Sequence, residues 1–383
     1  MAGIASAVDL PDTARAAVLR QFKSPVRIEE VPIPRTLEPH ALLVKIEACS
    51  ICGTDVHLWQ GNLNLAVDLP VILGHEMIGR IMAFGDDAEY DSMGQKLRPG
   101  DRVLYTHTAC GHCYFCTHEW QPTLCENRGA YMFMSMENSP HLLGGFAEYG
   151  YVLPNSGRIR VPDSVPDEHA NLASCALHSV MNSFDQLGSI AASDRLLIQG
   201  VGPLGLLATA IAKIRGARKV YVCGAPDDRL ALAKRFGADE AISITATTPE
   251  EREAWIKDRT DGRGADIVME FTGNPRAFVE GLRLLRKGGR YVVTGLLGGG
   301  EIPMAPSLIV TKQLKILGSF SGSPRHYWKA LDFLDAHAAE LPIDGMITGT
   351  YGLDDVTTAL ERMAALQEIK PIIRPHTSAA GRA

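Results

Sequence analysis

The sequence predicts an α/β protein in which a doubly wound parallel sheet is joined to a second, mostly β region. Between residues 187 and 321, apolar runs such as "KVYVCG" and "ADIVMEFTG" alternate with helical segments such as "RAFVEGLRLLRKGG". This alternation is typical of parallel βαβ units. Before residue 187, runs such as "ALLVKIEACS" and "MIGRIMAF" are broken by Pro and Gly, which predicts short strands and turns.

Composition excludes several classes of protein. The chain has 383 residues, 46% of them hydrophobic, so it can bury a core without disulfide bonds. A net charge of -6 argues against nucleic acid or an anionic membrane as partner, and no apolar run is long enough to span a bilayer. The N-terminus lacks the basic region of a secretory signal, so we expect a cytoplasmic protein. Thiols stay reduced there, and clustered cysteines then favour metal over disulfides.

Four of the eight cysteines lie close together, at Cys110, Cys113, Cys116 and Cys125. Four thiolates in a short loop can surround a tetrahedral Zn²⁺, and such a closed shell predicts a structural metal. An iron–sulfur cluster and free thiols are the alternatives. Iron–sulfur motifs usually place Pro after the distant cysteine, whereas Glu126 follows here, so zinc is favoured.

A second group of metal-binding side chains is spread over three stretches, "ACSICGTDVHLWQG", "PVILGHEMIGRI" and "NLASCALHSV". Cys52, His75 and Cys175 would supply two thiolates and one imidazole and leave a fourth position open, as a catalytic zinc requires. His178 lies one helical turn beyond Cys175 and competes with it as a ligand, ranked below it. Cys49 and Cys223 lie in apolar runs and are expected in the core.

A glycine motif indicates a dinucleotide site. The run Leu196 to Gln199 ends at "GVGPLG", which opens a helical pattern, so a strand, a turn and a helix follow one another. The glycines permit a tight turn and close approach to a pyrophosphate at the helix N-terminus. The residues expected to contact the cofactor are Gly200, Gly202, Pro203, Leu204, Gly205, Gly224 and Arg229.

The motif departs from its usual form at Gly224, where an acidic residue would bind the ribose hydroxyls of NAD. Its absence removes a barrier to the 2′-phosphate of NADP. Asp227 and Asp228 would repel that phosphate, and Arg229 would offset them. We therefore expect NAD, with NADP as the alternative.

Taken together, "CSICGTDVHLWQG", "LPVILGHEMIGRI", "RPGDRV", "CGHCYFCTHEWQPTLC", "GGFAEY", "GVGPLG" and "FTGNP" resemble the zinc-dependent medium-chain alcohol dehydrogenase family. The resemblance runs from about residue 16 to the C-terminus. It implies a Rossmann domain over 187–321 and a catalytic domain, built on an irregular GroES-like β-barrel, from residues 1–186 and 322–383. It also implies two zinc ions per chain.

The resemblance further implies roles for individual residues. Cys52, His75 and Cys175 match the catalytic zinc ligands, and the four clustered cysteines match the structural ones. Thr54 matches the hydroxyl that meets the substrate oxygen, and His57 the histidine that passes its proton to solvent. Asp55 and Glu76 match carboxylates near the catalytic zinc, and Glu76 is also a candidate ligand. Asp55 is expected to orient His75.

The predicted function is therefore the interconversion of an alcohol and an aldehyde or ketone by hydride transfer to or from NAD(P). Met and aromatic residues in "GAYMFMSMENSPHLLGGF" suit an apolar substrate if they line the site, or pack in the barrel or at a subunit interface. Polyol and threonine dehydrogenases of this family commonly use Glu as the third zinc ligand, and Cys175 disfavours them. Further alternatives are a zinc-independent reductase and a non-catalytic zinc and nucleotide-binding protein. A homodimer or homotetramer is expected from the family.

Overall fold

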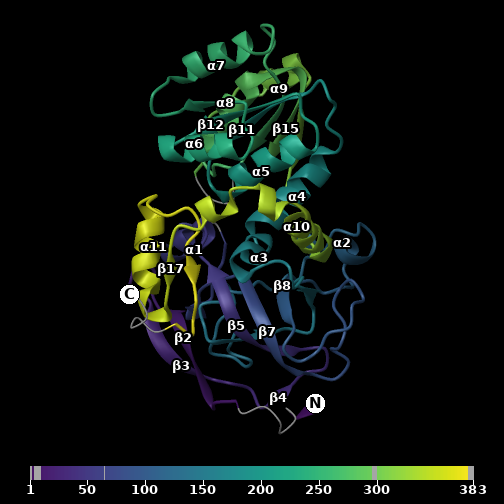
Figure 1. The fold of residues 1–383 in the computed structure, drawn as a ribbon, viewed down its shortest axis with the longest axis vertical. Coiled ribbons are helices and arrows are strands. Elements are labelled where there is room, and N and C mark those ends of the chain that lie inside the picture. The colour runs from purple at the N-terminus through teal and green to yellow at the C-terminus, as the bar shows by residue number, and fades with distance from the viewer. Residues whose placement is uncertain (1, 4–9, 64, 296–299, 378–383) are drawn as a thin grey trace. The chain divides into compact units, whose positions relative to one another are not determined.

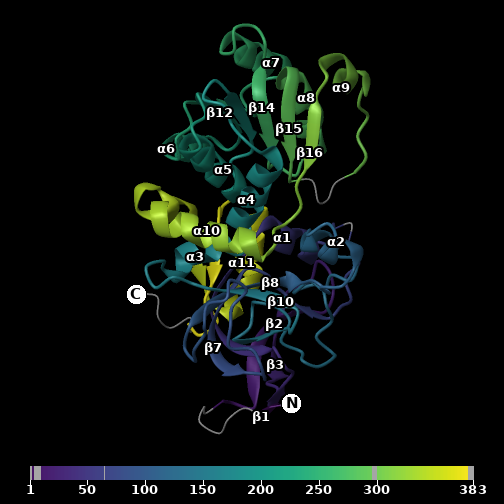
Figure 2. The same cartoon turned by 90° about the vertical axis from the view of Figure 1, so that its right-hand side faces the viewer.

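The computed structural model describes residues 2–3, 10–63, 65–295 and 300–377. The chain divides into two compact units. The first comprises Met1–His178, Gly322–Ala338 and Met346–Ala383, and the second comprises Ser179–Ser321 and Ala339–Gly345. Figures 1 and 2 show a mostly β unit and a unit in which helices flank a parallel sheet. The predicted fold class is thereby confirmed, whereas the domain boundaries at 186/187 and 321/322 stay a prediction.

The first unit is built on antiparallel strands. Its largest sheet has the order β10-β8-β7-β5-β18-β17, with β9 also paired to β5, and a smaller sheet has the order β3-β2-β6. The strands of these sheets are β2 (Thr13–Leu19), β3 (Arg27–Pro32), β5 (Leu42–Ser50), β6 (Val71–Ile72), β7 (Met77–Phe84), β8 (Arg102–Thr108), β9 (Tyr149–Val152), β10 (Ser156–Arg160), β17 (Thr350–Tyr351) and β18 (Ile372–Ile373). A two-stranded sheet pairs β1 (Ala2–Gly3) with β4 (Thr36–Leu37).

Strand β5 is the centre of this unit because it is paired to β7, β9 and β18. Its apolar side chains are buried in two core clusters that also take in residues of β2, β7 and the loop at 131–146. The helices of the unit are α1 (Gly53–Trp59), α2 (Tyr114–Thr117), α3 (Asp167–Ala173), α10 (Pro324–His337) and α11 (Val356–Ala364). Helix α4 (Ala176–Leu187) begins in this unit and continues into the other.

The C-terminal segment completes the β unit. Strand β18 runs antiparallel to β5, with Ile372 opposite Ser50 and Ile373 opposite Cys49. The amide of Ile51 donates to the carbonyl of Pro371 at 3.0 Å. Residues more than 300 positions apart in sequence therefore lie next to each other directly before the helix α1.

The second unit is a six-stranded parallel sheet of order β13-β12-β11-β14-β15-β16. Its strands are β11 (Arg195–Gln199), β12 (Lys219–Gly224), β13 (Glu240–Ser243), β14 (Ala265–Glu270), β15 (Leu285–Val293) and β16 (Lys315–Gly318). Its helices, apart from α4, are α5 (Pro203–Ile214), α6 (Asp227–Arg235), α7 (Pro249–Asp258), α8 (Pro275–Leu284) and α9 (Ser307–Lys312). The chain proceeds outward from β11 in one direction and then from β14 in the other, which is doubly wound topology.

Candidate active site

Four metal-binding side chains converge in the β unit, although three separate stretches of sequence supply them. One ligand atom from each of Cys52, His75, Glu76 and Cys175 lies within 4.8 Å of all the others. Cys52 precedes α1, His75 and Glu76 precede β7, and Cys175 lies between α3 and α4. The structure therefore brings together the three residues predicted as an open zinc site, with Glu76 beside them.

The first turn of α1 positions the Cys52 sulfur. Cys52 is the residue that caps this helix, and its Sγ accepts a hydrogen bond from the amide of Thr54 at 3.2 Å. The carboxylate of Asp55 accepts from the Cys52 amide in return, at 2.9 Å. This reciprocal pair is a capping box with a thiol in place of the usual hydroxyl, so the helix start also fixes the direction of the thiol.

His75 lies between Cys52 and the same carboxylate. Its Nε2 lies 3.5 Å from Cys52 Sγ, and its Nδ1 lies 3.7 Å from Asp55 Oδ2. The second distance is longer than a hydrogen bond, and His75 Nδ1 has no hydrogen-bond partner. Metal-bound imidazoles usually donate their second N–H to a carboxylate or carbonyl, so orientation of His75 by Asp55 stays a prediction. A tetrahedral zinc with ordinary Zn–S and Zn–N bonds would place a thiolate and an imidazole nitrogen about 3.6 Å apart. The observed separation therefore fits a shared zinc ion.

The electrostatics of the group favour a thiolate. Burial of Cys52 acts to raise its pKa, but a hydrogen bond from Cys175 and the positive charge of His75 outweigh it and lower the pKa to about 6. Burial of Asp55 is likewise outweighed by His75, so the pKa of Asp55 falls below its usual value. A zinc ion requires a deprotonated thiol and a neutral imidazole, so its charge would take the place of the proton on His75.

A buried ion pair beside the group was not predicted from the sequence. The ammonium of Lys370 contacts the Glu76 carboxylate, which also accepts a hydrogen bond from Ser50 Oγ. Lys370 is 1% exposed and Glu76 is fully buried. The amide of Asn171 donates to the Glu76 carbonyl at 2.6 Å. Lys370 lies two residues before β18, so only the return of the C-terminal segment brings it here, and its place among apolar residues in "EIKPII" was the available signal.

The proton-relay candidates lie on α1. Thr54 is half-buried and follows Cys52 by two residues, whereas His57 is exposed in the last turn of the helix. Thr54 and His57 are three residues apart and therefore share one face of α1.

The rival ligand His178 is absent from the converging group within the described residues. Its Nδ1 lies 3.1 Å from the carbonyl of Ala173, its ring stacks on Tyr327, and burial lowers its pKa to about 3.

The four clustered cysteines form a second group. Their sulfur atoms all lie within 4.8 Å of one another, and Cys113 Sγ is 3.9 Å from Cys125 Sγ. A tetrahedron of Zn–S bonds has sulfur separations of about 3.8 Å. All four are free thiols rather than disulfides. Gly111 has a φ of +76°, a left-handed conformation that makes the tight turn between Cys110 and Cys113.

Backbone amides also support thiolates in this loop. The amides of Cys110 and Asn127 approach Cys125 Sγ at 3.2 and 3.3 Å. The amide of His112 lowers the pKa of Cys110 to about 6. Among the residues that the structure describes, no fifth metal-binding side chain joins the four cysteines, which therefore fit a closed, structural zinc site.

In the other unit, the predicted cofactor turn joins β11 to α5. Gly200 has a φ of +109°, and Gly202 caps the helix with Pro203 in its first turn. A Cβ atom on Gly205 would lie 2.0 Å from the carbonyl oxygen of Gly200, so no larger residue fits there. The amides at the start of α5 form the usual binding site for a pyrophosphate.

Comparison with known proteins agrees with this geometry. A family model described as "Alcohol dehydrogenase GroES-like domain" matches residues 38–163, and one described as "Zinc-binding dehydrogenase" matches residues 203–336. A 5-exo-hydroxycamphor dehydrogenase of Pseudomonas putida is 34% identical over 94% of this chain and 98% of its own. The chain belongs to the zinc-binding dehydrogenase family, in the medium-chain dehydrogenase/reductase superfamily.

Other relatives of this dehydrogenase show the range of the family. An L-threonine 3-dehydrogenase of Thermococcus kodakarensis is 32% identical over 91% of this chain and 94% of its own. The crystal structure of an alcohol dehydrogenase from Thermotoga maritima superposes with a TM-score of 0.89 at 32% identity, over 95% of this chain and 100% of the other. A zinc-binding dehydrogenase from Sinorhizobium meliloti, solved with NADP, gives a TM-score of 0.82 at 29% identity, over 95% and 100% of the two chains.

Zinc and NAD(P) are accordingly the cofactors of this dehydrogenase. The structure adds a reason for the missing acidic residue at the end of β12. A Cβ atom on Gly224 would lie 2.7 Å from a methyl group of Val201, so a side chain there would displace the cofactor turn. Arg229 is 7% exposed, and burial lowers its pKa. Its contact with the cofactor stays a prediction.

The Met and aromatic residues at 131–136 pack in or against the core of the β unit, which is one of the alternatives their sequence left open. Tyr131 and Met132 are buried in a core cluster of the dehydrogenase, and Phe133 and Met134 pack against that cluster. Met136 packs against the second cluster of the same unit. Of the alternatives that the sequence left open, packing in the barrel therefore holds for Tyr131 and Met132, whose aromatic and thioether groups lie in its core.

Proposed function

We propose that this dehydrogenase interconverts an apolar alcohol and the corresponding aldehyde or ketone by hydride transfer to or from NAD(P). The observation that carries the proposal is the converging group of Cys52, His75 and Cys175, whose spacing fits a zinc ion with one position left for substrate. When bound, zinc polarises a substrate oxygen and the nicotinamide exchanges the hydride.

The residues of α1 are proposed to move the proton. The Thr54 hydroxyl, two residues after Cys52, donates a hydrogen bond to the substrate oxygen and passes its proton outward. His57 is exposed one turn further along the helix and exchanges protons with water. Imidazole is suited to this step because it can both gain and lose a proton near neutral pH. His57 is the only titratable side chain on α1 after Asp55. Asp55 itself accepts a hydrogen bond from the Cys52 amide and lies beside His75.

The ion pair of Glu76 and Lys370 is proposed to hold the charge of the site near neutrality. Two thiolates balance one zinc ion, and the buried carboxylates of Asp55 and Glu76 would then leave two negative charges, of which Lys370 offsets one. Burial of both partners keeps the attraction between Lys370 and Glu76 strong. We infer that this balance keeps the zinc electrophilic toward a neutral alcohol oxygen.

The Pseudomonas putida relative supports an apolar secondary alcohol, since that protein is a 5-exo-hydroxycamphor dehydrogenase. A threonine-type substrate is the second candidate, because an L-threonine 3-dehydrogenase is 32% identical to this chain, against 34% for the hydroxycamphor dehydrogenase. One further observation favours the second candidate. Arg128 and His107 both line a cavity of about 100 Å³. Burial is the main cause that lowers the pKa of His107 and of His178, and the charge of Arg128 lowers both further. A cation so placed could hold a substrate carboxylate.

The test follows the absorbance of reduced cofactor with NAD and with NADP over cyclic secondary alcohols, benzyl alcohol and L-threonine. The proposal expects kcat/KM for an apolar alcohol to exceed that for L-threonine by at least about 100-fold, roughly the loss from desolvating charged groups without a partner. Preference for L-threonine, lost in Arg128→Met, would instead establish the second candidate. Full activity of zinc-depleted protein would refute both.

We further propose that the protein works in the cytoplasm as a homodimer or homotetramer. Eight free thiols, four of them in one loop, suit a reducing compartment. Strand β16 lies at an edge of the parallel sheet, and Ile316 on it is 36% exposed, so this edge is open for pairing with a second copy. No helix among the described residues is long and apolar enough to cross a membrane. Sedimentation equilibrium would give the number of chains.

A further inference from the structure

A buried arginine in the β unit lacks a charged partner. Arg158 on β10 is 6% exposed. Its Nη1 has no hydrogen-bond partner, and its Nη2 donates only to the carbonyl of Pro154, at 3.3 Å. No carboxylate within the described ranges forms an ion pair with it. Burial lowers the pKa of Arg158, although a guanidinium stays protonated at neutral pH. Such a charge is costly unless something compensates it.

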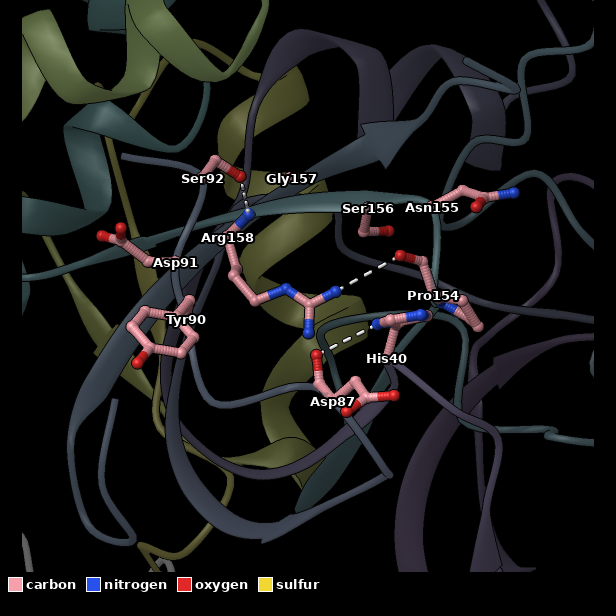
Figure 3. Close-up of a pocket in the computed structure, with 10 residues that line it drawn as sticks. All are labelled: His40, Asp87, Tyr90, Asp91, Ser92, Pro154, Asn155, Ser156, Gly157 and Arg158. Atoms are coloured by element: carbon pink, nitrogen blue, oxygen red, sulfur yellow. Dashed lines mark hydrogen bonds between the residues drawn. The ribbon is translucent and has the colours of Figure 1, made fainter. Parts of the chain in front are cut away.

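The guanidinium projects into a cavity of about 280 Å³, which Figure 3 shows in close-up. In Figure 3 the guanidinium of Arg158 points toward Pro154 and His40, which lie side by side, and Asp87 lies next to His40. The walls are tied together by hydrogen bonds. The amide of Arg158 donates to Ser92 Oγ at 3.0 Å, and His40 Nδ1 lies 3.0 Å from the carbonyl oxygen of Asp87.

The two carboxylates of the cavity do not neutralise the guanidinium. One oxygen of Asp91 accepts from the amides of Met93 and Gln95, both at 2.8 Å, and the other accepts from the amide of Arg160 at 3.1 Å. That carboxylate is thus satisfied by the backbone. Asp87 is exposed at the rim. Both acids nevertheless make the cavity unfavourable for an ion with more than one negative charge.

We propose that this cavity binds a small organic monocarboxylate, whose oxygens pair with the guanidinium of Arg158. A guanidinium offers two parallel N–H groups that match the two oxygens of a carboxylate. A volume of about 280 Å³ suits a ligand of a few carbon atoms. The cavity shares no residue with the zinc groups or the cofactor turn, so the site does not depend on the proposed function.

The test is isothermal titration calorimetry of the zinc-loaded full chain with NAD present, at constant chloride. The probes are acetate and L-lactate, with succinate and inorganic phosphate as doubly charged comparisons. Arg158→Met removes the charge and retains an apolar stem, and Arg160→Met on the same strand is the matched control. Arg160 pairs with Asp163 instead and is half-exposed.

The proposal expects a saturable monocarboxylate signal that Arg160→Met keeps and Arg158→Met weakens by about 10- to 100-fold, the range for a charge-assisted hydrogen-bonded pair. Monocarboxylates should bind more tightly than succinate or phosphate. Carboxylate binding at the zinc or the cofactor site would be the same in both variants and would overturn the assignment. So would equal binding of all the anions.

Melting curves test whether a loss of binding in Arg158→Met comes from a damaged fold or from the missing guanidinium. Without carboxylate, Arg158→Met should melt no lower than the unsubstituted chain, since an unpaired buried charge has been removed. Added acetate should raise the melting temperature of the unsubstituted chain only. If Arg158→Met melts lower in the absence of ligand, the arginine is a structural element and the proposal fails.

Discussion

Replacing Lys370 with Met should destabilise the β unit strongly, because it leaves the fully buried Glu76 carboxylate without its cation. Two unit charges about 3 Å apart, at an effective dielectric constant of about 20, attract by roughly 5 kcal/mol. Protonation of Glu76 limits the loss, because placing a proton on a carboxyl of ordinary pKa at pH 7 costs about 3.7 kcal/mol. We therefore expect the free energy of unfolding to fall by about 3 to 4 kcal/mol.

The same reasoning fixes a pH dependence. In the unsubstituted chain, burial acts to raise the pKa of Glu76, but the charges of Lys370 and His75 and the hydrogen bonds from Lys370 and Ser50 together hold that pKa below its usual value. In Lys370→Met, burial should raise that pKa above the unfolded value, so the variant loses stability as the pH rises through it. The deficit should be largest at pH 7 to 8 and shrink toward pH 5. The double variant with Glu76→Gln should recover part of it at neutral pH.

The assay is urea unfolding followed by Trp fluorescence, at several pH values, with the same zinc content. Lys96→Met is the control, because Lys96 is exposed, and its effect should stay within about 0.5 kcal/mol. A loss of less than about 1 kcal/mol for Lys370→Met at pH 7.5, without dependence on pH, would refute the ion pair as a stabilising element.

Three further changes test the two zinc groups and the cofactor turn. Cys113→Ser should lower zinc content by one ion per chain and lower the melting temperature, whereas an unchanged melting curve would contradict a structural role. Gly205→Val should raise KM for the cofactor at least about tenfold, since even a Cβ there meets the Gly200 carbonyl; retained cofactor affinity in a titration would contradict this. His57→Gln should reduce kcat by roughly 10-fold or more and leave zinc content unchanged, because the proton then lacks its outward path; an unaltered kcat would remove His57 from that path.

The features carried by local patterns could be predicted from the sequence. Strand–helix alternation gave the parallel sheet, and close cysteine spacing gave the four-thiol group. The glycine motif predicted the turn before α5 because both glycines are required locally. Gly200 has a positive φ, and a side chain on Gly205 would collide with the Gly200 carbonyl. For Cys52, His75 and Cys175, spacing offered only candidates, and the resemblance to a family joined them into one group.

Features that depend on distant contacts could not be predicted. The apolar residues around Lys370 in "EIKPII" indicate burial but name no partner, and only the pairing of β18 with β5 brings this lysine to Glu76. Tyr131 and Met132 are apolar whether they face substrate or core, so composition could not assign them. The absence of a side chain at Gly224, the last residue of β12, likewise follows from contact with Val201 in the turn after β11.

The central claim is tested most directly by anomalous diffraction at the zinc absorption edge, on crystals grown with zinc and NAD. The account predicts two peaks per chain. One should lie about 2.0 to 2.3 Å from Cys52 Sγ, His75 Nε2 and Cys175 Sγ, with a non-protein atom as its fourth neighbour. The other should lie among the four clustered cysteines. A catalytic peak whose fourth neighbour is the Glu76 carboxylate, or no peak there under zinc-replete conditions, would contradict the account.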